Sequence, residues 1–441
     1  MKKLTLFVAI ALSTAQGAYS QQVLSLTLDQ AVAMGLENSK ALHSSSMKVQ
    51  YADARSSEVS AMRLPSVKFG GSYTRLSEVA PFEIGPFPPV IPTAVTVSPS
   101  LLNNYNLRLT VQQPLFTGFR LQGSIDAADY TAEATALDYS RDKNELIYNV
   151  KNAYWTLFKA HAFEKFFGET VEQIQAHLAD VRNMYDQGMV TKNEFLKVEV
   201  QLSNAKLLLI DAKNSVQLAR LNLNNVIGLP LDTEIGLATG VQHSPLSFSQ
   251  LNALIETAMT NRSDMKAMDL RVKASEASVT AAKGNWFPQI YLVGNYYYAR
   301  PNQRIFPTKD AFKDTWDVGI SVSMDIWNWG TTIHQTTQAQ AQLAQAKDSY
   351  SQFKDGVTFE VTQNYLNLQQ SREKTEVAEQ AVAQAEENYR VTVEKFKTGL
   401  ALNSDVLDAE TALLQAKTNH TQAVVDYQLA EARLEKALGR Q

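Results

Sequence analysis

The sequence predicts a mixed α/β membrane protein that combines very long α-helices with four short β-strands. Three observations predict this class: two long stretches without proline, four segments of alternating apolar and polar residues, and a pattern that occurs twice along the chain. The alternating segments lie near residues 66–74, 105–113, 289–298 and 316–324. Each has about the length of a tilted strand that crosses a bilayer, so we expect spanning strands rather than spanning helices.

The composition excludes several classes of protein. The 441 residues contain no cysteine, which excludes disulfides, thiolate metal sites and a lipidated N-terminal cysteine. A total of 41 Lys and Arg against 45 Asp and Glu gives a net charge of −4, which argues against a nucleic-acid partner. The six histidines form no pair at metal-ligand spacing, and no phosphate-binding loop, nucleophile elbow or zinc-protease motif occurs. We therefore expect neither an enzyme nor a cofactor.

The first twenty residues have the features of a secretory signal peptide. Lys2 and Lys3 form a basic start, residues 4–12 form a short apolar core, and residues 18–20 form a cleavage site with small residues at its ends. The apolar core is too short to span a bilayer. We expect residues 1–20 to be removed and the remaining chain to be exported; the alternative is a buried N-terminal helix.

The remaining chain reads as a duplication. A constant offset relates pairs of residues in its two halves, first 223 and, beyond a loop, 211. The shift between the two offsets places twelve extra loop residues in the first half. We expect repeat 1 at 21–230, a linker at 231–250 and repeat 2 at 251–441. The offsets relate Asn38 to Asn261, Pro65 to Pro288, Tyr154 to Tyr365, Gly188 to Gly399, Glu199 to Glu410, and Gly228 to Gly439.

Each repeat predicts long helices that pair as coiled coils. Residues 331–398 contain a single glycine, Gly356, and no proline, so one helix of about 68 residues, roughly 100 Å long, can form. The segment that follows shows heptad spacing with small residues at alternate positions, which favours a rod or tube over an ordinary bundle. The heptad positions are Val406, Ala409, Leu413, Ala416, His420, Ala423, Tyr427, Ala430, Leu434 and Ala437, and in repeat 1 Phe195, Val198, Leu202, Ala205, Leu209, Ala212, Val216, Ala219, Leu223 and Val226.

The alternating segments predict strands with one face suited to lipid. Trp316, Val318 and Ile320, for example, are separated by Asp317 and Gly319. A soluble sandwich with one buried face is the alternative. Four strands cannot close a barrel, since about eight are needed, whereas three copies of the chain would supply twelve.

In this order, these features resemble the TolC-like outer-membrane channels, the exit ducts of tripartite efflux pumps and type I secretion systems. The resemblance covers about residues 26–439. It depends on the opening Leu26-Thr27-Leu28-Asp29-Gln30-Ala31, the turns that end in Pro65 and Pro288, the turns Pro114-Leu115-Phe116-Thr117-Gly118 and Asp325-Ile326-Trp327-Asn328-Trp329-Gly330, and the segment Phe396-Lys397-Thr398-Gly399-Leu400 with Asp405-Val406-Leu407-Asp408-Ala409-Glu410.

The resemblance implies a homotrimer in the cell outer membrane. Its twelve-stranded β-barrel would be continued across the periplasm by a hollow helical barrel, which is closed at the far tip by coiled coils. It also implies three kinds of partner: outer-membrane lipid, a periplasmic adaptor protein, and an inner-membrane transporter of the RND or ABC type. The exported cargo does not follow from it. The alternative is an exported coiled-coil structural or adhesive protein without a pore.

Four residues are implied at a periplasmic gate: Asp405, Asp408, Glu194 and Phe396. Asp405 and Asp408 are three residues apart and share a helix face, so a trimer would stack them as two rings of carboxylates; a solvated helix face is the alternative. Glu194 is the repeat-1 equivalent of Asp405. In the family an acid here helps to hold the tip closed through a tyrosine and an arginine on the neighbouring coil.

This sequence departs from that pattern, because Phe396 occupies the tyrosine position and Ala401 the arginine position. The closed state must therefore be held differently, and Lys192 or Lys197 could replace the missing contacts.

Two further sets of residues complete the expected site. Gly188-Met189 and Gly399-Leu400 end the ascending helices, where glycine permits a positive φ, and the resemblance implies that these tips also contact the adaptor. Aromatic side chains at the passage from strand to helix are expected at the membrane interface, with core packing as the alternative. They are Phe116, Phe119, Trp327 and Trp329.

Overall fold

The computed structural model describes residues 24–240 and 250–440, so the predicted signal peptide at 1–20 lies outside the described residues. The chain divides into two compact units. The first, here the helical unit, comprises the described residues up to Leu42, Lys143–Ala258 and those from Glu360 on. The second, here the sheet unit, comprises His43–Asp142 and Met259–Phe359. Each unit takes residues from both predicted repeats, so the compact units and the sequence repeats are different divisions of the chain.

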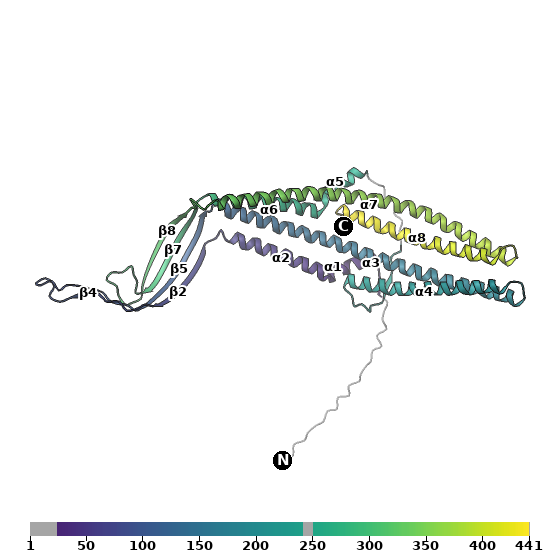
Figure 1. Cartoon of the computed structure of the whole chain (residues 1–441), viewed down its shortest axis with the longest axis horizontal. Helices are drawn as coiled ribbons and strands as arrows, with labels where there is room; N and C mark the ends of the chain where they lie inside the picture. The colour runs from purple at the N-terminus through teal and green to yellow at the C-terminus, as the bar shows by residue number, and fades with distance from the viewer. Residues whose placement is uncertain (1–23, 241–249, 441) are drawn as a thin grey trace, which may run out of the picture. The chain divides into compact units, whose positions relative to one another are not determined.

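The sheet unit contains the four strands (Figure 1). They are β2 (Ser66–Arg75), β5 (Asn103–Phe116), β7 (Gln289–Arg300) and β8 (Lys313–Ser323). They form one antiparallel sheet in the order β2-β5-β7-β8, so β2 and β8 are its edges. The unit also holds most of α2 (Lys40–Ala61), α6 (Ser263–Lys283), the 3₁₀ turn η1 (Gly284–Trp286), and the first parts of α3 (Arg120–Asp186) and α7 (Thr331–Lys397).

The strand register gives the sheet two chemically different faces. Val67 pairs with Val111, and Leu109 pairs with Tyr296, on one face. Residues of that face are exposed in the chain: Val67, Phe69, Tyr73, Leu107, Leu109, Val111, Leu292, Tyr296, Tyr298, Trp316, Val318, Ile320 and Val322. The opposite face carries mainly Ser, Thr, Asn and charged residues. Side chains alternate between faces along a strand, so the period-2 pattern of the sequence produces this separation directly.

The helical unit is built from paired long helices. It contains α1 (Leu28–Asn38), α4 (Lys192–Ile227), most of α5 (Leu251–Asn261), α8 (Asn403–Ala437), and the later parts of α3 and α7. Every predicted heptad position on α4 and α8 is buried or half-buried. Small seam residues such as Ala205 and Ala416, 4% and 8% exposed, let the helices approach closely. The coiled coils and the 67-residue helix α7 are therefore confirmed.

A compact core ties both coils to a small parallel sheet that the sequence did not predict. Strands β1 (Leu24–Leu26) and β6 (Ile235–Leu237) pair beside Tyr154, which is completely buried. The Tyr154 hydroxyl donates to the Leu26 carbonyl (3.1 Å) and accepts from the Thr239 amide (3.0 Å). A buried hydroxyl needs such partners, so this tyrosine fixes the start of α1 against α3.

Two further findings complete the description of the fold. The proline-rich loop after β2 contains a short hairpin, β3 (Phe82–Ile84) and β4 (Val95–Ser98), which the sequence did not predict. Among the described residues, no helix is both long and apolar enough to cross a membrane.

Candidate functional site

Helices α3 and α7 each end in a turn of the same type. Gly188 has φ +71° and Gly399 has φ +76°. In the first turn, the Gly188 and Met189 amides donate to the carbonyls of Tyr185 (2.9 Å) and Met184 (2.8 Å). The second turn repeats both bonds at Gly399 and Leu400. This is the Schellman arrangement that a left-handed glycine allows, and it leaves Met189 and Leu400 exposed, 69% and 78%, at the two tips.

The two descending helices begin differently. The Thr191 hydroxyl accepts a hydrogen bond from the Glu194 amide (3.3 Å) and caps α4. The equivalent position before α8 is Leu402, which has no side-chain acceptor. There the Asp405 carboxylate accepts from the Leu402 amide (2.8 Å). The carboxylate of Glu194 makes no corresponding bond to the Thr191 amide among the described residues and contacts other side chains, whereas that of Asp405 is already used in part.

Glu194 joins the two coils through Asn403. The Asn403 amide donates to the Glu194 carboxylate (3.1 Å) and to its backbone carbonyl (3.3 Å). On the other side of Glu194, the Lys197 ammonium lies 2.9 Å from the carboxylate. Hydrogen bonds from Lys197 and then Asn403 lower the pKa of Glu194. The structure thus pairs Lys197 with Glu194 and, among the described residues, gives Lys192 no such contact.

The same asparagine reaches a third helix. Its amide oxygen lies 2.6 Å from Nε2 of His177 on α3. The His177 ring in turn packs edge-on against Phe396 of α7, with 5.0 Å between ring centroids. Burial lowers the pKa of His177, although the bond to Asn403 acts in the opposite direction. Glu194, Asn403, His177 and Phe396 therefore connect all four coil helices, and we call them the tip network.

The tip network lies on an apolar core. Val181, Val198 and Val406 come from α3, α4 and α8, and each is at most 1% exposed. Burying such a side chain contributes about 1.5–3 kcal/mol. Asn403 (5% exposed) and Phe396 (7%) share this environment. Asn403 and Phe396 are thus shielded from water, whereas Glu194 and His177 are half-buried. A buried amide such as that of Asn403 is costly to leave without a partner.

Asp405 and Asp408 both lie exposed on α8. The shared face that their spacing predicts is therefore present in the single chain. Whether three copies bring these carboxylates together stays a prediction, because the ring needs neighbouring chains.

A buried acid further along α8 was not singled out from the sequence. Glu410 is 3% exposed, and its Oε1 atom has no hydrogen-bond partner. Burial raises the pKa of Glu410 from its ordinary value of 4.5 to about 7. The repeat-1 equivalent, Glu199, is exposed, so the duplication does not preserve this environment.

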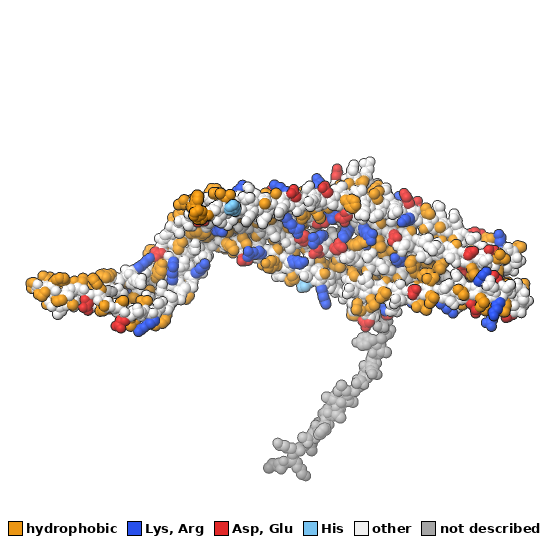
Figure 2. Space-filling view, in the orientation of Figure 1, with side chains coloured by type: hydrophobic (Ala, Val, Ile, Leu, Met, Phe, Trp, Pro, Cys, Tyr) orange, Lys and Arg blue, Asp and Glu red, His pale blue; other side chains and the backbone are white. Residues whose placement is uncertain are grey.

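The strand-to-helix turns gather the predicted aromatic residues. Phe116 and Phe119 pack at 5.7 Å, and Trp327 and Trp329 also at 5.7 Å. Phe119 and Trp329 have positive φ values, 65° and 55°, beside a glycine that also has positive φ, and this reverses the chain sharply. Trp327 and Trp329 remain 75% and 85% exposed, which is unlike core packing. Figure 2 shows hydrophobic side chains gathered at the start of α7.

The fold of this chain, an amphipathic sheet with paired long helices and tip turns, is that of solved outer-membrane channels. The outer-membrane channel OprN has this fold: it superposes with a TM-score of 0.78 over 94% of this chain and 90% of its own, at 20% sequence identity.

The chain belongs to the outer membrane efflux protein family, whose model matches residues 31–229 and 254–440. The outer membrane efflux protein BepC of Brucella suis is 24% identical over 332 residues, 75% of this chain and 71% of BepC. The outer membrane protein TolC of Vibrio cholerae is 24% identical over 318 residues, 72% of each chain. Family membership makes this protein an outer-membrane exit channel for efflux or type I secretion, with its helices in the periplasm. The pore-free rod has no support.

Sequence reasoning missed Asn403 and His177. Asn403 lies in the first turn of a helix, where a polar residue is usually interpreted as a cap. His177 is a single histidine within a long helix and belongs to no recognisable motif. Their pairing connects residues 226 positions apart, which only the packing of α3 against α8 reveals.

Proposed function

We propose that three copies of the chain close a twelve-stranded barrel in the outer membrane and act as a passive exit duct. The observation that carries this proposal is the sheet itself. Its edge strands β2 and β8 each pair on one side only, and an unpaired strand edge needs a partner inside lipid. One face is apolar and exposed, which suits lipid, and the other is polar, which suits a water-filled lumen.

The aromatic side chains at the strand-to-helix turns support the same placement. We assign Phe116, Phe119, Trp327 and Trp329 to the periplasmic membrane interface, where amphipathic rings are favoured. The exposure of both tryptophans in the single chain supports this assignment.

The tip network supports a gate at the periplasmic end. It takes the place of the tyrosine and arginine contacts that this chain lacks, because Asn403 holds Glu194 and His177 at once. Opening the tip would separate the coils and break these bonds. In a trimer, Asp405 and Asp408 would line the same entrance and attract cations there.

Partner contacts follow from the exposed tips. Met189 and Leu400 are exposed apolar side chains next to the left-handed glycines of the two tip turns. Together with Gly188 and Gly399 they offer a surface for a periplasmic adaptor, which would link the duct to an inner-membrane transporter of the RND or ABC type.

The test measures the mass of the purified particle and its conductance in planar bilayers. Light scattering of the purified protein in detergent is expected to give three chains per particle, and planar bilayers are expected to show single channels of low conductance. Asn403→Leu removes the central contact of the tip network and should raise the open probability. Asn419→Leu, an exposed change on the same helix, is the matched control. A monomeric particle without channels would refute the duct, whereas channels that Asn403→Leu leaves unchanged would remove only the gate assignment.

A further inference from the structure

The polar face of the sheet carries an excess of positive charge. Lys68 on β2, Arg108 on β5 and Lys313 on β8 belong to this face by register, because they pair with Thr110, Tyr297 and Ala299. Arg304, from the loop between β7 and β8, also lies over this face, since its guanidinium contacts Asp317 and Tyr297. Asp317 is the acid that the four strands place there. Four cations against one acid leave a net charge of +3 per chain.

The contacts on this face leave most of that charge unneutralised. Arg304 pairs with Asp317, which also accepts a hydrogen bond from the Asn295 amide (2.7 Å). Arg108 instead donates two hydrogen bonds to the neutral oxygen of Asn295, at 3.0 and 2.7 Å. Lys68 is exposed and makes no hydrogen bond or ion pair with the described residues. The charges of Lys68 and Arg108 are therefore directed to the solvent on this face.

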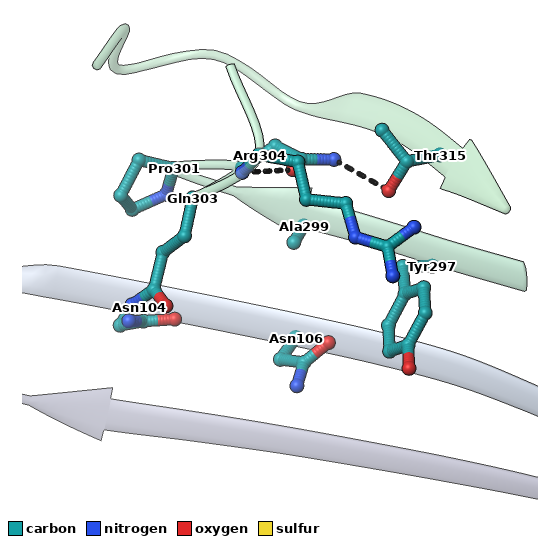
Figure 3. Close-up of a pocket in the computed structure, with 9 residues that line it drawn as sticks. Asn104, Asn106, Tyr297, Ala299, Pro301, Gln303, Arg304 and Thr315 are labelled. Atoms are coloured by element: carbon teal, nitrogen blue, oxygen red, sulfur yellow. Dashed lines mark hydrogen bonds between the residues drawn. The ribbon is translucent and has the colours of Figure 1, made fainter. Parts of the chain in front are cut away.

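An aromatic ring lies between the two guanidinium groups. The ring centroid of Tyr297 is 5.3 Å from Cζ of Arg108 and 5.1 Å from Cζ of Arg304. Such contacts hold a guanidinium in place without reducing its charge. Figure 3 shows Tyr297 beside Arg304 in a pocket that is otherwise lined by uncharged groups, among them Asn104, Asn106 and Thr315. The loop of Arg304 is fixed as well, because Asn302 bonds the Arg304 amide (3.0 Å) and the Thr315 hydroxyl (3.2 Å).

We propose that this surface makes the strand-lined section of the channel selective for anions, with Lys68 and Arg108 as the residues that set the preference. The inference rests on the proposed function, because it requires the polar face to line the pore. The ligands are small inorganic anions and solutes that carry a carboxylate or phosphate. Three copies would place nine net positive charges around one lumen, and fixed charges within a narrow low-dielectric wall concentrate counter-ions.

The position of these charges matters more than the net charge of the whole protein, which is −4. Charges separated by more than about 10 Å are largely screened at 0.1 M salt, so ions that pass the strands respond mainly to the charges that the sheet itself carries.

The test is the reversal potential of single channels in planar bilayers under a potassium chloride gradient. Lys68→Gln with Arg108→Gln is expected to lower the chloride-to-potassium permeability ratio by about twofold or more. Lys68→Gln alone should give part of this change, and it breaks no hydrogen bond or ion pair among the described residues. Arg75→Gln is the matched control, since it removes the same charge from the opposite face of β2.

The outcomes separate the two proposals. Channels whose permeability ratio is the same in wild type and in the double variant overturn the anion preference and leave the duct intact. An equal shift in Arg75→Gln overturns it as well, because the face would then be irrelevant. Absence of conductance from the wild type and from every variant refutes the pore, and the anion preference with it.

Discussion

Glu410→Gln is expected to stabilise the coiled coil strongly at alkaline pH and little at acid pH. The carboxyl group is buried without a partner for Oε1, and its pKa is about 7 in the folded chain against 4.5 ordinarily. A carboxyl with a raised pKa binds its proton more tightly in the folded state, so stability falls as the pH rises from about 4.5 to about 7. The difference between the two pKa values, at about 1.4 kcal/mol per unit, corresponds to about 3 kcal/mol per chain above pH 8.

The assay is guanidinium-induced loss of helical circular dichroism for the wild type and the variant at pH 5 and at pH 8.5. A neutral amide avoids the penalty of ionisation, so the gain in unfolding free energy should approach 3 kcal/mol at pH 8.5 and fall to about 1 kcal/mol or less at pH 5. Glu199→Gln is the control, because its side chain is exposed and should show no such pH dependence. An equal gain at both pH values, or the same gain in the control, would refute the reasoning.

Three further predictions concern other parts of the helical unit. Gly188→Ala places a side chain at φ +71° and should lower the unfolding free energy by about 1 kcal/mol. Gly168→Ala, inside α3 with open space around it, should raise the unfolding free energy by about 0.5–1 kcal/mol. The denaturant midpoints of the two variants should therefore shift in opposite directions. Tyr154→Phe removes two buried hydrogen bonds and should cost about 1–3 kcal/mol in the same measurement. Because the pKa of Glu194 is lowered, the hydrogen bonds of its carboxylate should be lost only as the pH falls through that lowered value. Lys197→Met should move this loss to higher pH, and the pH dependence of channel opening would report the change. An unchanged pH profile in this variant would contradict the prediction.

Periodic features were predictable from the sequence because they arise within single elements. The alternation around Val318 predicts a strand with two faces, and the heptad around Leu413 predicts the buried stripe of α8. Features that depend on two distant segments were not predictable. Glu410 and Glu199 occupy equivalent sequence positions, but only one of them is covered by packing. The tip turns lie between these cases: glycine predicts the turn, while the hydrogen bonds of Asn403 depend on the neighbouring coil.

The open edges of the sheet impose a condition on how the protein is made. A newly exported chain offers two rows of unsatisfied backbone groups beside a water-repelling surface, and this combination lets strands stack into aggregates. In the proposed trimer, closure of three copies into one barrel in lipid would pair both edges. Export that outpaces insertion should therefore lower the yield of channels more than in proportion, because isolated chains meet one another before they meet the membrane.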